Sequence, residues 1–88
     1  MKLYHLTGKP LEGDHLDPRR SPTGEVFATP VIDPWVVPGW RYYSRLFVYE
    51  VLDKDGWEVY EIFPGQMAFR ASSPKKVRFL KTLDIEEA

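Results

Sequence analysis

The chain contains no cysteine, which excludes a disulfide framework and any thiolate metal site. Its stability must therefore come from packing, and the lack of cysteine fits the reducing cytoplasm, where we expect the protein to reside. No apolar run approaches the roughly 20 residues that cross a bilayer, and the N-terminus turns polar at once, so we expect no membrane span and no signal peptide. The net charge of −1 argues against general nucleic-acid binding, which needs a positive field.

Apolar and aromatic residues are abundant by contrast. Hydrophobic residues make up 43% of the chain, which has 3 Trp, 5 Tyr and 5 Phe. Such a composition predicts a folded core and argues against disorder. With 88 residues the chain has room for one core, so we expect residues 1–88 to form a single domain.

The spacing of apolar residues predicts a mainly β fold, α+β with little helix. Alternating or dense β-branched and aromatic residues predict strands at residues 4–7, 25–29, 45–52, 57–63 and 77–83. The strand at 45–52 has apolar side chains on both faces and should be buried on both. Ser73-Pro74 also suits the start of a helix, but the charges that follow it oppose the helix macrodipole and favour a strand.

Turn residues divide these strands. Asp55-Gly56 is a tight-turn signal and predicts a hairpin between the strands at 45–52 and 57–63. Residues 8–23 are rich in Pro, Gly, Asp and Arg and should form a surface loop. Three prolines within residues 30–39 predict an irregular segment with a buried side, and residues 40–44 could form the one short helix.

The first strand, Tyr4-His5-Leu6-Thr7, has two polar side chains in an apolar setting. Because successive side chains on a strand point to opposite faces, His5 and Thr7 share one face. They either satisfy each other in a core or line a cleft that grips a polar ligand. A histidine on a strand is usually only packed, so the rest of the chain must decide between these alternatives.

The order of four segments resembles the ADP-ribosyltransferase fold, most nearly the small rifampin ADP-ribosyltransferases. That family has Tyr-His-Gly-Thr on its first strand, Tyr-Phe-Thr on its second, Val-Tyr-x-Val on its third, and Ser-Tyr-Arg-Ser-x-Glu-Pro before a closing apolar strand. The matching segments here are Tyr4-His5-Leu6-Thr7, Val26-Phe27-Ala28-Thr29, Val48-Tyr49-Glu50-Val51 and Ala68-Phe69-Arg70-Ala71-Ser72-Ser73-Pro74.

This resemblance implies a small, split, twisted β-sheet with a cleft for NAD between its halves. NAD would be a substrate, and ADP-ribose would pass to a small molecule or a protein. His5 would then bond a ribose hydroxyl, the backbone of Leu6 would face the nicotinamide amide, and Phe27 would stack. Arg19 or Arg20 would meet the pyrophosphate. The implied cofactor-binding residues are His5, Leu6, Thr7, Arg19, Arg20, Phe27 and Thr29.

The catalytic carboxylate has no motif of its own, and Glu58 and Glu61 are the candidates. Glu61 shares a strand face with Trp57, Val59 and Phe63, which predicts a buried carboxylate with a raised pKa. The alternative is a solubilising charge on an edge strand.

Two departures from the family pattern favour a second function. Leu6 stands where the family has Gly, and residues 30–39 replace a helix. The chain could instead be a catalytically inactive member that binds a protein or senses a nucleotide. Its partner surface would be the aromatic segment, which we define as Trp35, Trp40, Tyr42 and Tyr43.

Three further patterns are less specific. Asp14, His15 and Asp17 could hold a metal, but a loop with three ligands and no fourth is usually only solvated, so we expect no metal site. A basic run with one aromatic suits phosphate or RNA, although a solvated strand face explains it better; it comprises Lys75, Lys76, Arg78, Phe79 and Lys81. RNA 2′-phosphotransferase-like chemistry and an unrelated small β-barrel remain as alternatives.

Overall fold

Strands dominate the computed structural model, which describes residues 1–85. The strands are β1 (Tyr4–Thr7), β2 (His15–Leu16), β3 (Val26–Ala28), β4 (Arg45–Val51), β5 (Glu58–Phe63), β6 (Gln66–Ala71) and β7 (Lys75–Asp84). Three single 3₁₀ turns accompany them: η1 (Pro18–Arg20), η2 (Pro34–Val36) and η3 (Trp40–Tyr42). The expected mainly β class is therefore confirmed. Within residues 1–85, no helix is long and apolar enough to cross a membrane.

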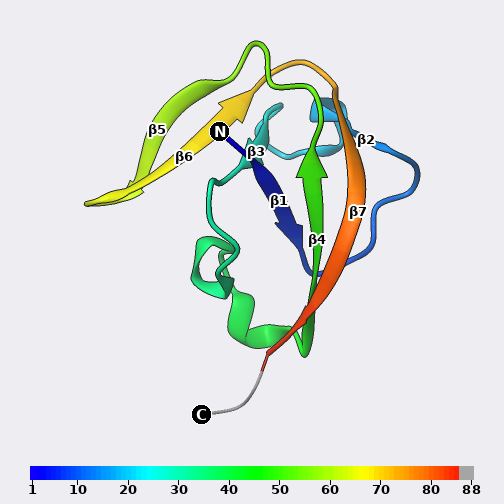
Figure 1. Cartoon of the computed structure of the whole chain (residues 1–88), viewed down its shortest axis with the longest axis vertical. Helices are drawn as coiled ribbons and strands as arrows, with labels where there is room; N and C mark the ends of the chain where they lie inside the picture. Colours follow the sequence, from blue (N-terminus) through cyan, green and yellow to red (C-terminus); the bar gives the residue numbers. More distant parts are fainter. Residues whose placement is uncertain (86–88) are drawn as a thin grey trace.

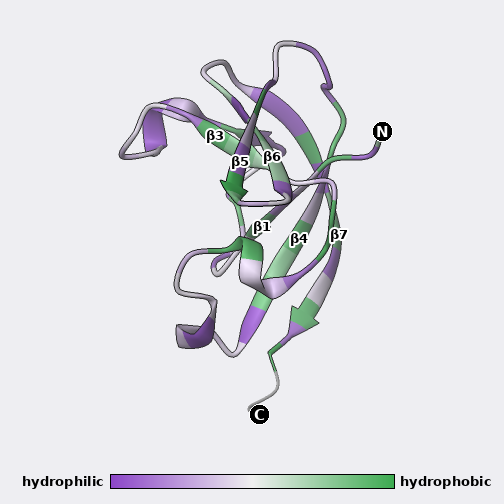
Figure 2. Ribbon diagram, turned by 90° about the vertical axis from the view of Figure 1, so that its left-hand side faces the viewer, coloured by the Kyte–Doolittle hydropathy of each residue, from purple (hydrophilic) through white to green (hydrophobic). Residues whose placement is uncertain are grey.

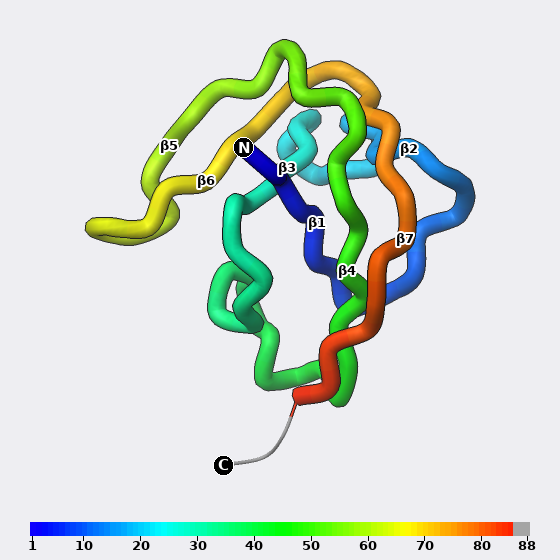
Figure 3. The backbone as a smooth tube through the Cα atoms, in the orientation of Figure 1, coloured from blue at the N-terminus to red at the C-terminus, as the bar shows by residue number. Residues whose placement is uncertain are grey.

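The strands form two antiparallel sheets that meet along one seam. One sheet has the order β1-β4-β7-β2 and the other β3-β6-β5. Tyr4 and Thr29 join them, since each donates its backbone N–H to the carbonyl of the other at 2.8 Å. The result is a curled half-barrel, in which the β5–β6 hairpin leans away from β1, β4 and β7 (Figures 1 and 3).

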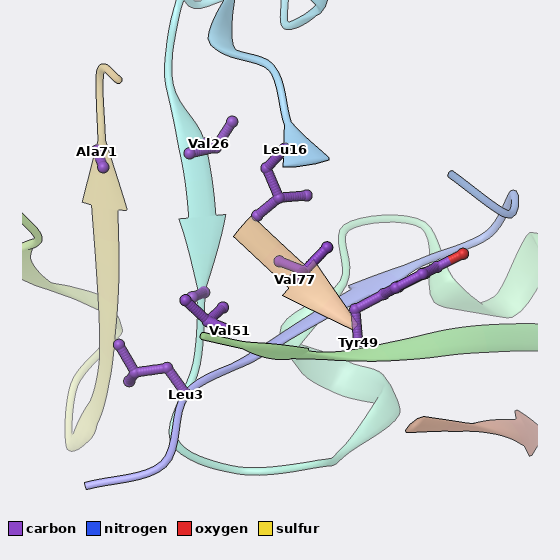
Figure 4. Packing of buried hydrophobic residues seen from close by; sticks show 8 residues of the cluster. Leu3, Leu16, Val26, Tyr49, Val51, Ala71 and Val77 are labelled. Carbon is purple, nitrogen blue, oxygen red and sulfur yellow. The ribbon is translucent and has the colours of Figure 1, made fainter. Parts of the chain in front are cut away.

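Strand β4 is the centre of the molecule and is buried on both faces, as its sequence predicts. Leu46 and Val48 on one face are fully buried and pack against residues of the 31–37 segment. Tyr49 and Val51 on the other face belong to a second cluster, part of which Figure 4 shows. The irregular segment thus covers one face of β4 in place of a helix, and the apolar stretches of β1 and β4 lie beside it in Figure 2.

The predicted hairpin between β4 and β5 is wrong. The two edges of β4 are taken by β1 and β7, and β5 pairs with β6 instead. Leu52 and Asp53 both donate their N–H groups to the carbonyl of Lys76, at 2.9 and 3.4 Å. These bonds draw the Asp55-Gly56 turn onto β7, so the turn forms a corner between the sheets.

Strand β6 was not among the predicted strands, whereas the remaining elements follow the sequence more closely. The last element is a strand, and the register of β4 and β7 shifts at Val48/Tyr49, which leaves Leu80 as the extra residue of a β-bulge. The short helix expected at residues 40–44 is the single turn η3. The loop expected at residues 8–23 holds β2 and η1, because the apolar Leu16 is buried beside β7.

Candidate functional site

Two cavities adjoin at the side chains of His5 and Phe27. The polar cavity, of about 310 Å³, has Glu12, His15, Asp17, Arg20 and Glu25 in its wall. The apolar cavity, of about 300 Å³, has Leu6, Val36, Val37, Pro38, Tyr60 and Ile62 in its wall. His5 and Phe27 line both. A ligand that filled both cavities would therefore pass these two residues.

The His5 ring is fixed by a bond across the seam between the sheets. Its Nδ1 lies 2.7 Å from the carbonyl oxygen of Phe27. A carbonyl can only accept, so Nδ1 carries the proton, and Nε2 of the neutral ring is an acceptor. Within residues 1–85, Nε2 has no hydrogen-bond partner, and no buried side-chain nitrogen or oxygen lacks one. Nε2 is thus open to a donor on a ligand.

Burial lowers the pKa of His5 below its ordinary value of 6.5, and the bond to Phe27 only partly opposes this effect. We expect stability to fall as the pH drops below 6.5, because the unfolded chain takes up a proton there and the folded chain does not. The loss should level off below the folded pKa. Urea unfolding at a series of pH values will show this slope in the wild type and not in His5→Gln; equal slopes would contradict it.

Of the other predicted residues on the first two strands, Phe27, Leu6 and Thr29 line a cavity and Thr7 does not. Phe27 is partly exposed, and its ring meets the Tyr60 ring edge to face at 6.0 Å. Leu6 is buried and lines the apolar cavity. Thr29 is buried there and donates its hydroxyl to the carbonyl of Val31 at 2.6 Å. Thr7 lines neither cavity; its hydroxyl accepts from the backbone of Lys9 at 3.3 Å.

The structure separates the two candidate arginines. The Arg19 guanidinium reaches both oxygens of Asp17, each at 3.1 Å, and its side chain is 88% exposed. It does not line the polar cavity. Arg20 does, with its nearest partner, Glu12, at 3.6 Å. Only Arg20 is therefore placed to meet an anionic group in the cavity.

The prediction that Glu61 is buried is wrong. Glu61 is exposed and accepts from the backbone of Gly65 at 3.3 Å. On the edge strand β5, it is Tyr60 and Ile62 that point inward, and Val59 and Phe63 share the outer face with Glu61. Apolar residues occur on both faces of this strand, so its pattern cannot tell which face is buried.

Neither predicted carboxylate lines a cavity. Glu58 bonds Arg70 at 2.6 Å. Glu25 is the carboxylate that the sequence interpretation missed. It precedes β3, two residues before Phe27, and lines the polar cavity with it. Because residues two apart on a strand share a face, the spacing of Glu25 from the candidate stacking residue Phe27 could have identified it.

The remaining patterns are largely structural. Among residues 1–85, no three His, Asp or Glu side chains are grouped to hold a metal ion. His15 instead pairs with Asp14 at 2.6 Å. In the basic run, Lys75 is buried and Arg78 bonds Glu50 at 2.6 Å, so the run is not one continuous basic face.

The aromatic segment is partly open to solvent. Trp35 is 53% exposed and Tyr42 is 92% exposed. The Arg41 guanidinium lies 5.3 Å from the centre of a Trp40 ring. Tyr43 packs so closely on Gly8 that a Cβ added at Gly8 would overlap the ring. The segment is therefore anchored at Tyr43 and exposed at Trp35 and Tyr42.

No protein-family model matches the chain, and no curated protein and no solved structure is significantly similar to it. The chemistry of the two cavities therefore bears most directly on function. The polar cavity offers a neutral imidazole acceptor, a guanidinium and carboxylates. The apolar cavity offers a slot with aliphatic and aromatic walls. Together they suit a ligand that joins an apolar part to a polar part with hydrogen-bond donors.

Proposed function

We propose that the two cavities bind an adenine dinucleotide, with NAD as the expected ligand. The observation that carries this proposal is the meeting of a polar and an apolar cavity at His5 and Phe27. A nucleotide has the matching build, because its flat base is joined through a ribose to phosphate. The nicotinamide ring would lie in the apolar cavity, and its ribose and the phosphates would lie in the polar one.

Each residue of the site has a role in this arrangement. His5 Nε2 would accept a hydrogen bond from a ribose hydroxyl, since Nδ1 is committed to Phe27. Phe27 and Tyr60 would contact the base through their rings. Arg20 would leave its exposed partner Glu12 and form a charge-assisted fork with the pyrophosphate.

Transfer of ADP-ribose is the reaction that this site would support. Breaking the bond between the ribose C1′ and the nicotinamide nitrogen leaves the electron pair on the nicotinamide and positive charge on the ribose. The acceptor's nucleophilic atom then bonds to C1′ and loses its proton. Glu12 and Glu25 in the wall of the polar cavity would place negative potential near that charge.

Two matched pairs of variants test the binding site. Arg20→Ala should weaken NAD binding about tenfold, because a charge-assisted bond is lost, and Arg19→Ala should not weaken it. Phe27→Ala should weaken binding by a similar factor, whereas Phe63→Ala on the outer face of β5 should leave it unchanged. Isothermal titration calorimetry with NAD measures all four. No heat from the wild type, or equal losses within a pair, would overturn the proposal.

A second function, a catalytically inactive nucleotide sensor, is favoured by one observation. Val36 and Val37 line the apolar cavity, and the exposed Trp35 and Tyr42 lie on the same stretch of chain. A ligand in the cavity would thus touch Val36 and Val37, which lie between Trp35 and Trp40 of the surface that a protein partner would bind. Incubation with NAD labelled in its nicotinamide separates the two functions: release of nicotinamide supports transfer, and binding without release supports the sensor.

A further inference from the structure

Arg70 lies beside Phe27, which lines both cavities. It is on β6, the middle strand of its sheet, directly opposite Phe27 on β3 and Glu58 on β5. Residues directly opposite each other in a sheet project to the same face. The guanidinium bonds Glu58 at 2.6 and 3.2 Å, and its Nε lies 3.7 Å from Glu25. Arg70 is thereby fixed against both neighbouring strands.

Of the carboxylates in the polar cavity, Glu12 and Glu25 have free acceptor capacity, and Glu25 is the less exposed of the two. Asp17 has both oxygens bonded to the Arg19 guanidinium, and the Glu12 side chain is 85% exposed. The Glu25 side chain is only 34% exposed, and within residues 1–85 its one ion-pair partner is Arg70. An ion pair at 3.7 Å is too long for a strong hydrogen bond, so the Glu25 oxygens can accept from a ligand.

Arg70 also reaches the apolar cavity through Tyr60. Its guanidinium carbon lies 5.5 Å from the centre of the Tyr60 ring. That ring lines the apolar cavity and meets the edge of Phe27. A guanidinium beside an aromatic ring attracts it electrostatically and limits its rotation. One side chain therefore supports Glu25 in the polar cavity and Tyr60 in the apolar cavity.

We infer that Glu25 binds a ribose hydroxyl of the ligand and that Arg70 is a positioning residue, which holds Glu25 against that ribose and Tyr60 against the nicotinamide. The inference rests on the proposed dinucleotide site and adds to it a carboxylate and the residue that orders both cavities. Glu25 would act on the ribose alone. Arg70 would act on the ribose and the base together.

NAD and free nicotinamide separate these two roles, because nicotinamide has no ribose. Glu25→Gln should weaken NAD binding about fivefold, since a bond to a charged acceptor becomes one to a neutral acceptor, and should leave nicotinamide binding unchanged. Arg70→Met should weaken both ligands, and Arg70→Lys should restore part of the affinity for NAD, because it keeps the charge beside Glu25. Calorimetry measures NAD, and NMR titration measures nicotinamide.

Glu61→Gln is the matched control, since it removes an exposed carboxylate outside both cavities. Urea unfolding of each variant shows whether a loss of binding reflects a loss of fold. If the wild type binds NAD and Arg70→Met binds nicotinamide as the wild type does, the positioning role is wrong. If Glu25→Gln matches Glu61→Gln with NAD, the role of Glu25 is wrong. If the wild type binds neither ligand, the proposed function itself fails.

Discussion

Lys75→Met should lower the free energy of unfolding by about 3 kcal/mol. Lys75 is only 3% exposed, although its side chain carries a charge. Its Nζ donates to the carbonyl oxygen of Asp55, lies 3.8 Å from an Asp53 carboxylate oxygen, and lies 5.6 Å from the Trp57 ring centre. Methionine fills a similar volume but leaves the Asp55 carbonyl without its donor. The corner between the two sheets should therefore loosen.

Lys76→Met is the control for this change. Lys76 follows Lys75 on β7, and its side chain is exposed, so the substitution should alter stability by no more than about 0.5 kcal/mol. Urea unfolding, followed by tryptophan fluorescence, measures both variants and also reports on Trp57. Equal midpoints for the two variants would show that the buried ammonium does not stabilise the corner.

Leu46→Ala should cost about 3 kcal/mol of stability, within the usual range for a buried leucine. Leu46 is fully buried and packs in one cluster with Leu6 and Val36. Those two residues line the apolar cavity. The space left by Leu46 should let residues 34–38 shift, so we also expect weaker binding of nicotinamide. Urea unfolding and NMR titration measure the two effects.

Leu80→Ala removes the same atoms from an exposed site. Leu80 is the bulge residue of β7 and is 42% exposed, so its removal should cost less than about 1 kcal/mol. A loss as large as that of Leu46→Ala would contradict the assignment of the core. A normal nicotinamide affinity in folded Leu46→Ala would show that the cavity wall does not depend on this packing.

The five longer apolar periods predict β1, β3, β4, β5 and β7, whereas β2 and β6 were not predicted, and β6 is the strand that pairs with β5. Asp55-Gly56 specifies that the chain turns, and here it turns with Gly56 at a φ of +74°. It does not specify which strand receives the returning chain. Here the backbone of Lys76 and the side chain of Lys75 hold the turn on β7, although the place of Lys75 in a basic run suggests a surface charge. A buried lysine that donates to the backbone of a distant turn leaves no local pattern in the sequence.

The site was predictable in part for similar reasons. His5 could be singled out because a polar ring in an apolar strand needs a partner or a ligand. The alternation that pairs His5 with Thr7 gives the face and not the extent of a cavity, and Thr7 lies beyond it. Arg19 and Arg20 are neighbours in sequence, and only the turn η1 and the capping by Asp17 distinguish them.

The seam between the two sheets gives ligand binding a mechanical consequence. Tyr4 and Thr29 join the sheets through two backbone bonds, and the His5 bond to Phe27 crosses the same line. Both cavities lie over this line, since His5 and Phe27 line each of them. A molecule that fills both cavities would contact both sheets and would oppose a change in their relative orientation. Occupancy of the site would then be coupled to the relative orientation of the two sheets.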